Sequence, residues 1–314
     1  MRLELYIPPR KPFDVVGLGL NAVDHILVIP KYPGPDTKLS IVDYYKGGGG
    51  QVATALVALS RWGMKTKYIG RIGSDEFGEF QKQSLKKEGV DIRELKKIEC
   101  ARSQFSFIMV EEKTGRRTIV WERDQRLRIE PHEVKEGVIS KGRILHLDTH
   151  EVYASIEAAR IARRHNIPVV LDAEKIKERT EELLRLVDVL ISSTTFPEKL
   201  TGKKDFRKAL REMKGYGCKI VCATLGKHGA IALYKDKFIV SKGFKIKARD
   251  TTGAGDVFHA GFIYGMLKNW EIEDIMKFSN AAAALKCRSL GARQGIARMG
   301  EIREFMRKHK TSAC

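Results

Sequence analysis

The chain has 314 residues, of which 43% are hydrophobic, and its 58 Lys and Arg against 39 Asp and Glu give a formal net charge of +19. This length is sufficient for one large α/β domain with an appendage or for two small domains. No apolar run approaches the roughly 18 residues of a membrane helix, and the N-terminus lacks the apolar segment of a signal peptide. We therefore expect a cytoplasmic protein that has no membrane partner.

The basic residues occur mostly as scattered pairs with acids nearby, and only the tail from Arg307 to Lys310 forms a dense run. Solvated helix faces explain this distribution, so we do not expect nucleic acid as the main partner. The five cysteines are odd in number and lack a paired metal-ligand pattern. Free thiols are therefore expected rather than disulfides or a zinc site.

The first predicted strand covers residues 14–19, and an extended stretch follows Asp24. The letters GLGLNA begin like a dinucleotide fingerprint, but the third glycine is missing and a strand follows where a helix is needed, which excludes that reading. Further along, the four glycines 47–50 precede a helix predicted over 52–62. They would let the helix N-terminus meet a ligand at close range.

Four short strands are predicted at about 23–31, 38–46, 104–111 and 117–123. The last two flank Thr114-Gly115, which suits a hairpin loop. From residue 143 onward, strands alternate with helices, which predicts right-handed crossovers and a mainly parallel sheet covered on both faces. Ligands should then bind beyond the carboxyl ends of the strands, where four polar residues fall: Asp148, Asp172, Ser192 and Thr224.

The stretch from Arg249 to Met266 joins a polar turn to an apolar helix that should begin near Asp256. Gly253 and Gly255 would let the backbone approach a ligand, and the N–H groups of the first helical turn could point at negative charge. Asp256 beside such a site could take a proton from a hydroxyl that attacks a phosphoryl group. It could equally be a simple helix cap.

The letters DTTGAGD, Asp250 to Asp256, resemble the C-terminal signature of the ribokinase-like (PfkB) carbohydrate kinases. The resemblance spans the chain from about residue 15 to residue 296. It implies one three-layer α/β sandwich domain over residues 1–314, with a mainly parallel central sheet and a lid made of the four short strands. It also implies that Asp256 is the catalytic base, and that Gly253, Ala254 and Gly255 form an anion hole.

On the sugar side, the resemblance implies contacts from Asp24, Gly49 and Gly50, and from Thr54 where many members carry Asn. On the nucleotide side, it implies ATP contacts from five residues: Ser193, Thr224, Gly226, Gly229 and Asn280. It also implies Mg²⁺ and a monovalent cation such as K⁺, the latter at Asp250 and the carbonyl of Thr252. The family's usual N-x-x-E motif is missing, since Ser193 to Phe196 stand in its place, so Mg²⁺ should be held mainly by the phosphates and water.

The expected function is ATP-dependent phosphorylation of a sugar hydroxyl, in a chain most similar to the branch that includes sulfofructose kinases. Strand alternation places Arg117, Ile119, Trp121 and Arg123 on one face of the lid, which favours an anionic or strongly polar sugar; pairing of these arginines with nearby acids is the alternative. The lid's uncovered face and edges suggest a homodimer. Two alternatives remain. The chain could be a nucleoside kinase, or a non-catalytic nucleic-acid-binding or regulatory protein with this fold.

Overall fold

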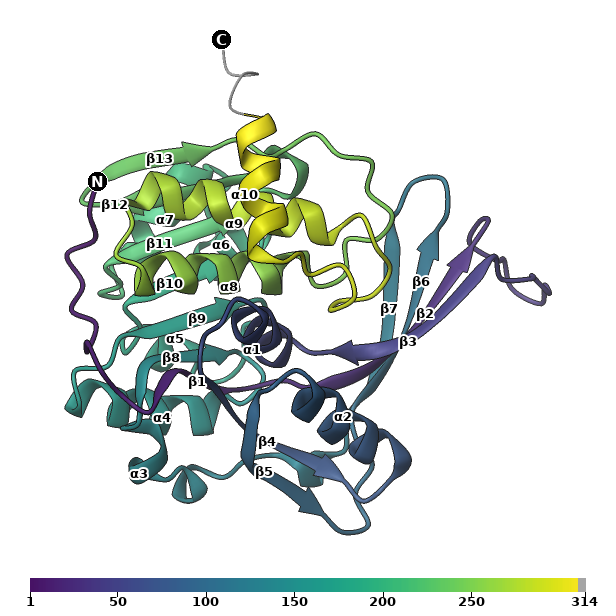
Figure 1. Cartoon of the computed structure of the whole chain (residues 1–314), viewed down its shortest axis with the longest axis horizontal. Helices are drawn as coiled ribbons and strands as arrows, with labels where there is room; N and C mark the ends of the chain where they lie inside the picture. The colour runs from purple at the N-terminus through teal and green to yellow at the C-terminus, as the bar shows by residue number, and fades with distance from the viewer. Residues whose placement is uncertain (310–314) are drawn as a thin grey trace.

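In a computed structural model that describes residues 1–309, the chain forms a large sheet, a small sheet and helices packed around the large one (Figure 1). The large sheet has nine strands in the order β13-β12-β11-β10-β9-β8-β1-β4-β5. Its strands are β1 Phe13–Leu18, β4 Thr66–Gly73, β5 Asp91–Ile98, β8 Gly142–Asp148, β9 Val169–Ala173, β10 Val189–Ser192, β11 Ile220–Thr224, β12 Ala230–Tyr234 and β13 Lys237–Ser241.

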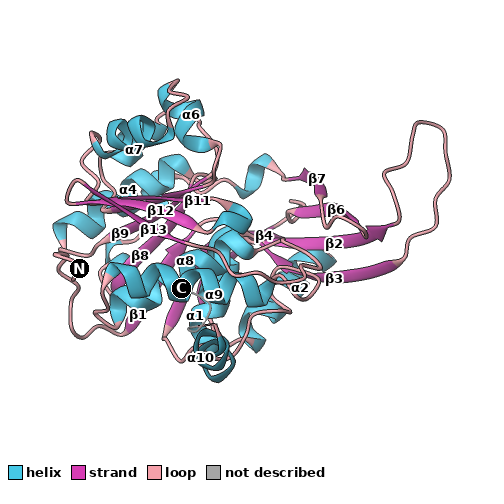
Figure 2. Cartoon of the chain, turned by 90° about the horizontal axis from the view of Figure 1, so that it is seen from above, coloured by secondary structure: helices cyan, strands magenta, loops and turns pink. Residues whose placement is uncertain are grey.

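Helices cover both faces of this sheet, as Figure 2 shows: α4, α6 and α7 lie on one side, and α1, α8, α9 and α10 on the other. The α-helices are α1 Gln51–Arg61, α2 Glu76–Lys87, α3 Glu136–Ile139, α4 Val152–Arg164, α5 Thr180–Leu184, α6 Phe196–Thr201, α7 Phe206–Lys214, α8 Ala254–Leu267, α9 Ile272–Lys286 and α10 Met299–Lys308. Short 3₁₀ turns lie at Gln125–Leu127, Pro131–Glu133 and Gly226–His228.

Buried hydrophobic residues form two clusters, one on each face of the large sheet, and successive residues of a central strand belong to different clusters. In β9, Val170 packs with the α1, α8 and α9 side, whereas Val169 and Leu171 pack with the α4 to α7 side. Both clusters are apolar because a mainly parallel sheet is buried on both faces. The predicted ribokinase-like α/β class, with its mainly parallel sheet and helices on both sides, is confirmed.

The order of the strands reverses at β1, which pairs in parallel with β8 on one side and β4 on the other. Crossover connections leave on opposite sides at such a point and open a crevice at the carboxyl ends of the strands. The stretch after β1, the end of β9 and the residues after β10 and β11 all reach this edge of the sheet. The edge of the large sheet at which ligands are predicted to bind therefore lies beside the small sheet.

The small sheet has the order β3-β2-β6-β7, with strands β2 Ala22–Ile29, β3 Asp43–Gly49, β6 Phe105–Glu111 and β7 Arg117–Glu122. It projects from one side of the large sheet (Figure 1), and we refer to it as the lid. The strand expected over 38–46 lies later, at 43–49, because the glycine run continues the pairing with β2 up to Gly49. The expected hairpin turn at Gly115 is confirmed by its φ of 65° and the pairing of β6 with β7.

Several smaller features complete the fold. Strand β5 carries no clear strand signal, because charged residues dominate this edge of the sheet and edge strands tolerate them. Cys218, Cys222 and Cys287 are buried free thiols and Cys100 is an exposed one, as expected; Cys314 and the end of the basic tail, Lys310, lie outside the described residues. None of the helices described over residues 1–309 is both long and apolar enough to cross a membrane.

Candidate active site

A cavity of about 580 Å³ lies between the carboxyl edge of the large sheet and the lid. We call it the central cleft. Loops from several parallel strands, the N-terminus of α8 and the inner face of the lid all line it, which is the arrangement typical of small-molecule sites in α/β proteins. Its lining includes Asp24, Gly50, Ser106, Arg117, Ile119, Trp121, Asp172, Glu174, Lys175, Ser193, Thr224, Gly226, Thr252, Gly253, Ala254, Gly255 and Asp256.

The sugar side of the cleft is built around Asp24 on the inner face of the lid. Register places Asp24 opposite Ser106, whose hydroxyl donates to the Asp24 carboxylate at 2.7 Å. Burial raises the pKa of Asp24, although this hydrogen bond opposes the shift. A Cβ at Gly49 would collide with the Asp24 carboxylate, so glycine is required for β3 to pass beside it. Gly50 lines the cleft itself, as expected for the glycine pair.

Thr54 lies behind this loop and not in the cleft lining. Its side chain is fully buried in α1, and its hydroxyl accepts a hydrogen bond from Nε of Arg293 at 3.4 Å. The same guanidinium donates to the carbonyl of Gly49 at 2.6 Å and to Oδ1 of Asn21 at 2.9 Å. Arg293 therefore holds the glycine loop in place. Sequence reasoning missed it because its partners are remote in the chain.

The polar loop before α8 forms the phosphate side of the cleft. Gly253 is the N-cap of α8 with a φ of 77°, and a Cβ there would lie 2.7 Å from Cα of Ala292, so a glycine suits this position. Ala254 already donates its N–H to the Thr251 carbonyl at 3.2 Å. Over residues 1–309, no backbone acceptor takes the N–H groups of Gly253, Gly255 and Asp256. These three amides are therefore available for an anion at the helix N-terminus.

Asp256 lies in the first turn of α8 and lines the cleft. Burial, together with the neighbouring carboxyl of Asp172, raises the pKa of Asp256 to about 8. Burial also raises the pKa of Asp172 well above its usual value, with Glu174 adding to the shift. A carboxyl with a raised pKa in a cleft is suited to accept a proton from a substrate hydroxyl. Asp172, at the end of β9, joins Asp24 and Asp256 in the cleft.

Asp250 and Thr252 are placed differently from the expectation of a monovalent cation site. The Asp250 carboxylate is fully buried and accepts from the Thr252 N–H and hydroxyl through Oδ1, and from the Gly291 N–H through Oδ2. The Asp250 carbonyl accepts from the ammonium of Lys286 at 3.0 Å. The Asp250 oxygens are therefore already engaged, whereas the Thr252 carbonyl accepts no backbone hydrogen bond over residues 1–309. A second cation at Asp250, beside the ammonium, would be repelled. The residues present do not fit a bound monovalent cation.

On the nucleotide side, Ser193, Thr224 and Gly226 line the cleft, but Gly229 and Asn280 do not. The Asn280 amide donates to the carbonyl and hydroxyl oxygens of Ser241 at 3.0 and 2.9 Å, so it ties α9 to β13. Gly229 turns the chain between β11 and β12 with a φ of 97°. Phe196, in place of the family's usual acid, is fully buried in the core.

The lid contributes two contacts across the cleft. Strand register places Arg117, Ile119 and Trp121 on the inner face with Asp24. The Arg117 guanidinium donates to the Thr251 hydroxyl in the loop before α8, and the Lys175 ammonium lies 4.3 Å from the centre of the Trp121 ring. Two cations thus connect the lid with the large sheet over the cleft. Lys175 was not singled out by sequence reasoning because it follows β9 in an ordinary charged loop.

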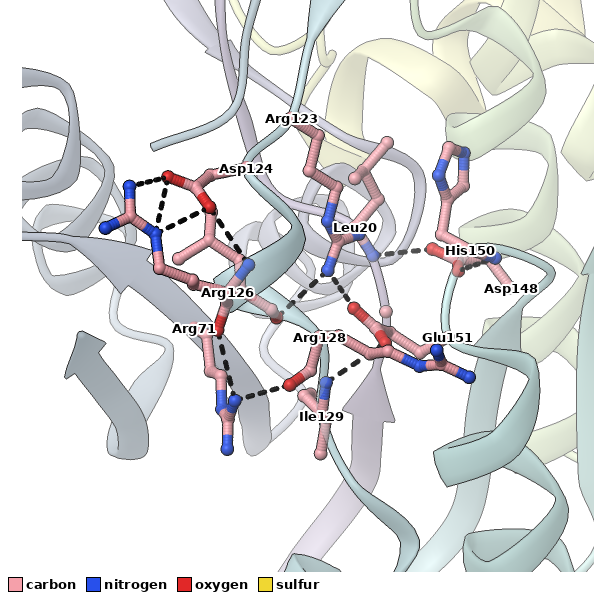
Figure 3. A network of polar contacts seen from close by, with 12 residues as sticks. Leu20, Arg71, Arg123, Asp124, Arg126, Arg128, Ile129, Asp148, His150 and Glu151 are labelled. Atoms are coloured by element: carbon pink, nitrogen blue, oxygen red, sulfur yellow. Dashed lines mark hydrogen bonds and ion pairs between the residues drawn. The ribbon is translucent and has the colours of Figure 1, made fainter. Parts of the chain in front are cut away.

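Arg123 does not reach the central cleft, contrary to its expected role in sugar binding. Strand β7 ends at Glu122 and the chain turns away, so the alternation no longer applies to Arg123. Its guanidinium pairs with Glu151, as Figure 3 shows, and donates to the Leu127 carbonyl at 3.1 Å. Glu151 is 4% exposed and also accepts from the Ile129 N–H. The alternative of pairing with acids near the hairpin is not found either, because the partner of Arg123 is Glu151, which precedes α4.

Arg123→Ala is therefore expected to reduce stability while leaving substrate binding nearly unchanged. The substitution leaves the buried Glu151 carboxylate without its partner, a change that costs about 3 kcal/mol in the free energy of unfolding. Denaturant unfolding measures this loss, and the double variant Arg123→Met/Glu151→Gln should recover part of it. A large rise in KM for the sugar at unchanged stability would instead return Arg123 to the substrate site.

Comparison with known proteins agrees with this geometry. Residues 14–298 match the profile described as pfkB family carbohydrate kinase. A ribokinase of Haemophilus influenzae is 30% identical over 305 residues, covering 95% of this chain and 99% of the relative. A 5-dehydro-2-deoxygluconokinase of Clostridium perfringens is 26% identical, covering 96% of this chain and 95% of the relative.

A solved structure described as a putative ribokinase II from E. coli in complex with ATP and Mg²⁺ has a TM-score of 0.83 at 21% identity. The alignment covers 95% of this chain and 100% of that one, and at this identity it shows the shared fold. The profile, by contrast, spans nearly the whole chain, including the loop before α8 and the glycine loop before α1. The chain therefore belongs to the pfkB family of carbohydrate kinases.

Proposed function

We propose that this ATP-dependent carbohydrate kinase phosphorylates an anionic or strongly polar sugar, with Asp256 as the general base. One observation carries the proposal: Asp24 on the lid and Asp256 at the N-terminus of α8 line the same cleft, beside three backbone amides that have no acceptor within residues 1–309. Asp24 is suited to hold sugar hydroxyls, Asp256 to take a proton, and the amides to hold an anion. The packing of the lid against the large sheet sets how far Asp24 lies from Asp256.

In the proposed reaction, Asp24 and the Gly49-Gly50 loop orient the sugar so that one hydroxyl meets Asp256. Asp256 takes the proton of that hydroxyl as its oxygen attacks the terminal phosphoryl group of ATP, and ADP leaves. The N–H groups of Gly253, Gly255 and Asp256 face the charge that develops on the phosphoryl group. Positioning and preorganised charge supply the catalysis, as is usual for phosphoryl transfer.

Mg²⁺ bound with the nucleotide would neutralise charge on the phosphates. Two carboxyl groups, Asp172 and Glu174, line the cleft next to Asp256, and oxygen ligands are the kind that Mg²⁺ takes. Because Mg²⁺ keeps several of its waters, we propose that these carboxyls hold the hydrated ion and that the phosphates are its direct ligands. The neighbouring Ser193 hydroxyl adds a further oxygen. A monovalent cation is not part of the proposed function, since the Asp250 oxygens are engaged.

Two cations that line the cleft, Arg117 and Lys175, favour an anionic or strongly polar substrate. Arg117 is exposed on the inner face of the lid, and Lys175 stands over Trp121. A guanidinium fork matches phosphate, sulfonate or carboxylate oxygens, and closure of the lid would exclude water from that contact. A sugar that carries such a group, or several hydroxyls in its place, fits these residues.

A panel of sugars, anionic sugars and nucleosides, assayed for ADP release with ATP and Mg²⁺, tests the proposal. The highest kcat/KM is expected for an anionic sugar. Preference for adenosine or inosine would identify a nucleoside kinase instead. Salt-dependent binding of DNA or RNA without turnover of any compound would favour the non-catalytic alternative.

Asp256→Asn is expected to lower kcat by about 10² to 10⁴-fold, the usual cost of losing a general base. The fold and the affinity for ATP should be retained, because the amide occupies the same volume. Steady-state kinetics and nucleotide titration measure both effects. In the wild type, only unprotonated Asp256 can accept the proton, and burial raises its pKa to about 8; kcat/KM should therefore fall as the pH decreases below that value. An acid limb near pH 4, or normal turnover in the variant, contradicts the assignment.

Arg117→Met is expected to raise KM for the best anionic sugar by about tenfold or more, since hydrogen bonds to charged groups contribute about 1.5 to 3 kcal/mol. The KM for its neutral counterpart should change much less. Arg116→Met, on the neighbouring exposed position of the same hairpin, is the matched control. An equal fall in kcat with both sugars would instead place the Arg117 guanidinium on the transferred phosphoryl group.

We propose that a second copy of the chain covers the outer face of the lid. Register places Tyr44, Phe107 and Val120 on this face, and their exposed fractions are 49%, 44% and 58%. Apolar side chains grouped in this way are typical of an interaction surface. Sedimentation at increasing concentration should show a dimer that Val120→Lys dissociates. A monomer at every concentration would contradict the pairing.

A further inference from the structure

Lys286, the last residue of α9, is a lysine whose side chain is fully buried. Buried lysines are rare unless a partner compensates the charge. The hydrogen bond described for this ammonium over residues 1–309 goes to the Asp250 carbonyl at 3.0 Å. The side chain thus crosses from the end of α9 to the first residue of the loop before α8, and its place in the core is explained by that contact.

The Asp250 contact belongs to a larger connection between the two segments. The N–H groups of Arg249 and Asp250 both donate to the Cys287 carbonyl, at 2.8 and 3.2 Å. In the other direction, the Gly291 N–H donates to the Asp250 carboxylate at 2.8 Å. The C-terminal end of α9 and the turn after it therefore determine where the loop before α8 lies. A positive charge at a helix C-terminus is also favoured by the helix dipole.

This position is where the family resemblance implied a monovalent cation with Asp250 and the Thr252 carbonyl as ligands. In this chain both oxygens of the Asp250 carboxylate accept hydrogen bonds, and the Asp250 carbonyl accepts one from the Lys286 ammonium. An ion added from solution would have to displace those donors and lie beside a like charge. A tethered ammonium makes the same kind of contact with a backbone oxygen without having to bind from solution.

We infer that the Lys286 ammonium takes the place of a monovalent cation, so that it orders the loop from Asp250 to Asp256 and the enzyme does not require K⁺. The inference rests on the proposed kinase function, since that loop supplies the amides and Asp256. Lys286 is then a positioning residue: it acts on the reacting groups through the backbone of the loop. If Lys286 has this role, the activity of the kinase does not depend on the K⁺ concentration.

The first test uses the wild-type enzyme and no substitution. Turnover is measured with ATP, Mg²⁺ and the best sugar of the panel, while KCl replaces choline chloride at a constant ionic strength of about 0.1 M. Equal rates at every ratio of the two salts are the expected result. A saturable rise in kcat with K⁺ would overturn the inference.

The second test uses Lys286→Ala, which removes the ammonium and leaves space beside Asp250. In choline chloride its kcat should fall by about tenfold to 100-fold, because small displacements of catalytic groups cost rates of that size, and KCl should restore most of it. Lys277→Ala, on the same helix but half-buried outside the cleft, should behave like the wild type in both salts. Full activity of Lys286→Ala in choline chloride, or a loss that K⁺ does not repair, would overturn the inference.

A thermal measurement separates this inference from the proposed function. KCl, compared with choline chloride, should raise the melting temperature of folded Lys286→Ala and leave that of the wild type unchanged. This readout needs no turnover, so it remains decisive if no compound of the panel is phosphorylated, an outcome that would refute only the proposed function. A K⁺-specific shift in the wild type would overturn the inference, whatever the activity. Should Lys286→Ala not fold, the wild-type comparison still decides.

Discussion

The hydrogen bonds of the Asp250 carboxylate are the constraint on which the phosphate side of the cleft depends. Its two oxygens join the Thr252 N–H and hydroxyl on one side to the Gly291 N–H on the other. The loop before α8 is thereby bent so that Gly253 caps the helix, and the N–H groups of Gly253, Gly255 and Asp256, residues that line the cleft, have no backbone acceptor over residues 1–309. A buried carboxylate is stable here because its acceptor positions are satisfied by fixed donors. The amides need no rearrangement when a phosphoryl group arrives, which is the condition for electrostatic preorganisation.

Charge in the cleft is divided between its walls. The floor, at the carboxyl edge of the large sheet, holds Asp172 and Asp256, whose burial raises their pKa values. The lid brings the Arg117 guanidinium, and the Lys175 ammonium, from the loop after β9, lies 4.3 Å from the centre of the lid's Trp121 ring. The floor is thus suited to proton transfer and the roof to anionic groups. Because the lid contacts the loop before α8 through Arg117, its position affects both the sugar and the phosphate sides.

Much of the fold and part of the site could be predicted from the sequence. Alternation of strands and helices indicated the parallel sheet, and the DTTGAGD and glycine motifs indicated Asp256, Gly253 and Gly50, which all line the cleft. These signals are local, because a turn, a cap or a close approach needs particular residues within a few positions. Thr54 was assigned from the family resemblance and Arg123 from strand alternation, but each side chain has a partner outside the cleft, Arg293 and Glu151. Local alternation could not show that β7 ends before Arg123.

The sequence by itself determined the fold class, the family and the loop that carries Asp256, since periodicity and contiguous motifs express local backbone requirements. Only the tertiary structure decided how the loops are held. Arg293 reaches Gly49 across 244 residues, and Lys286 reaches Asp250 across 36. Neither contact has a sequence signature, because a long basic side chain looks the same whether it is solvated or buried. Its role is defined by the backbone oxygens that folding brings to its charge, and those oxygens come from segments that meet only in the packed protein.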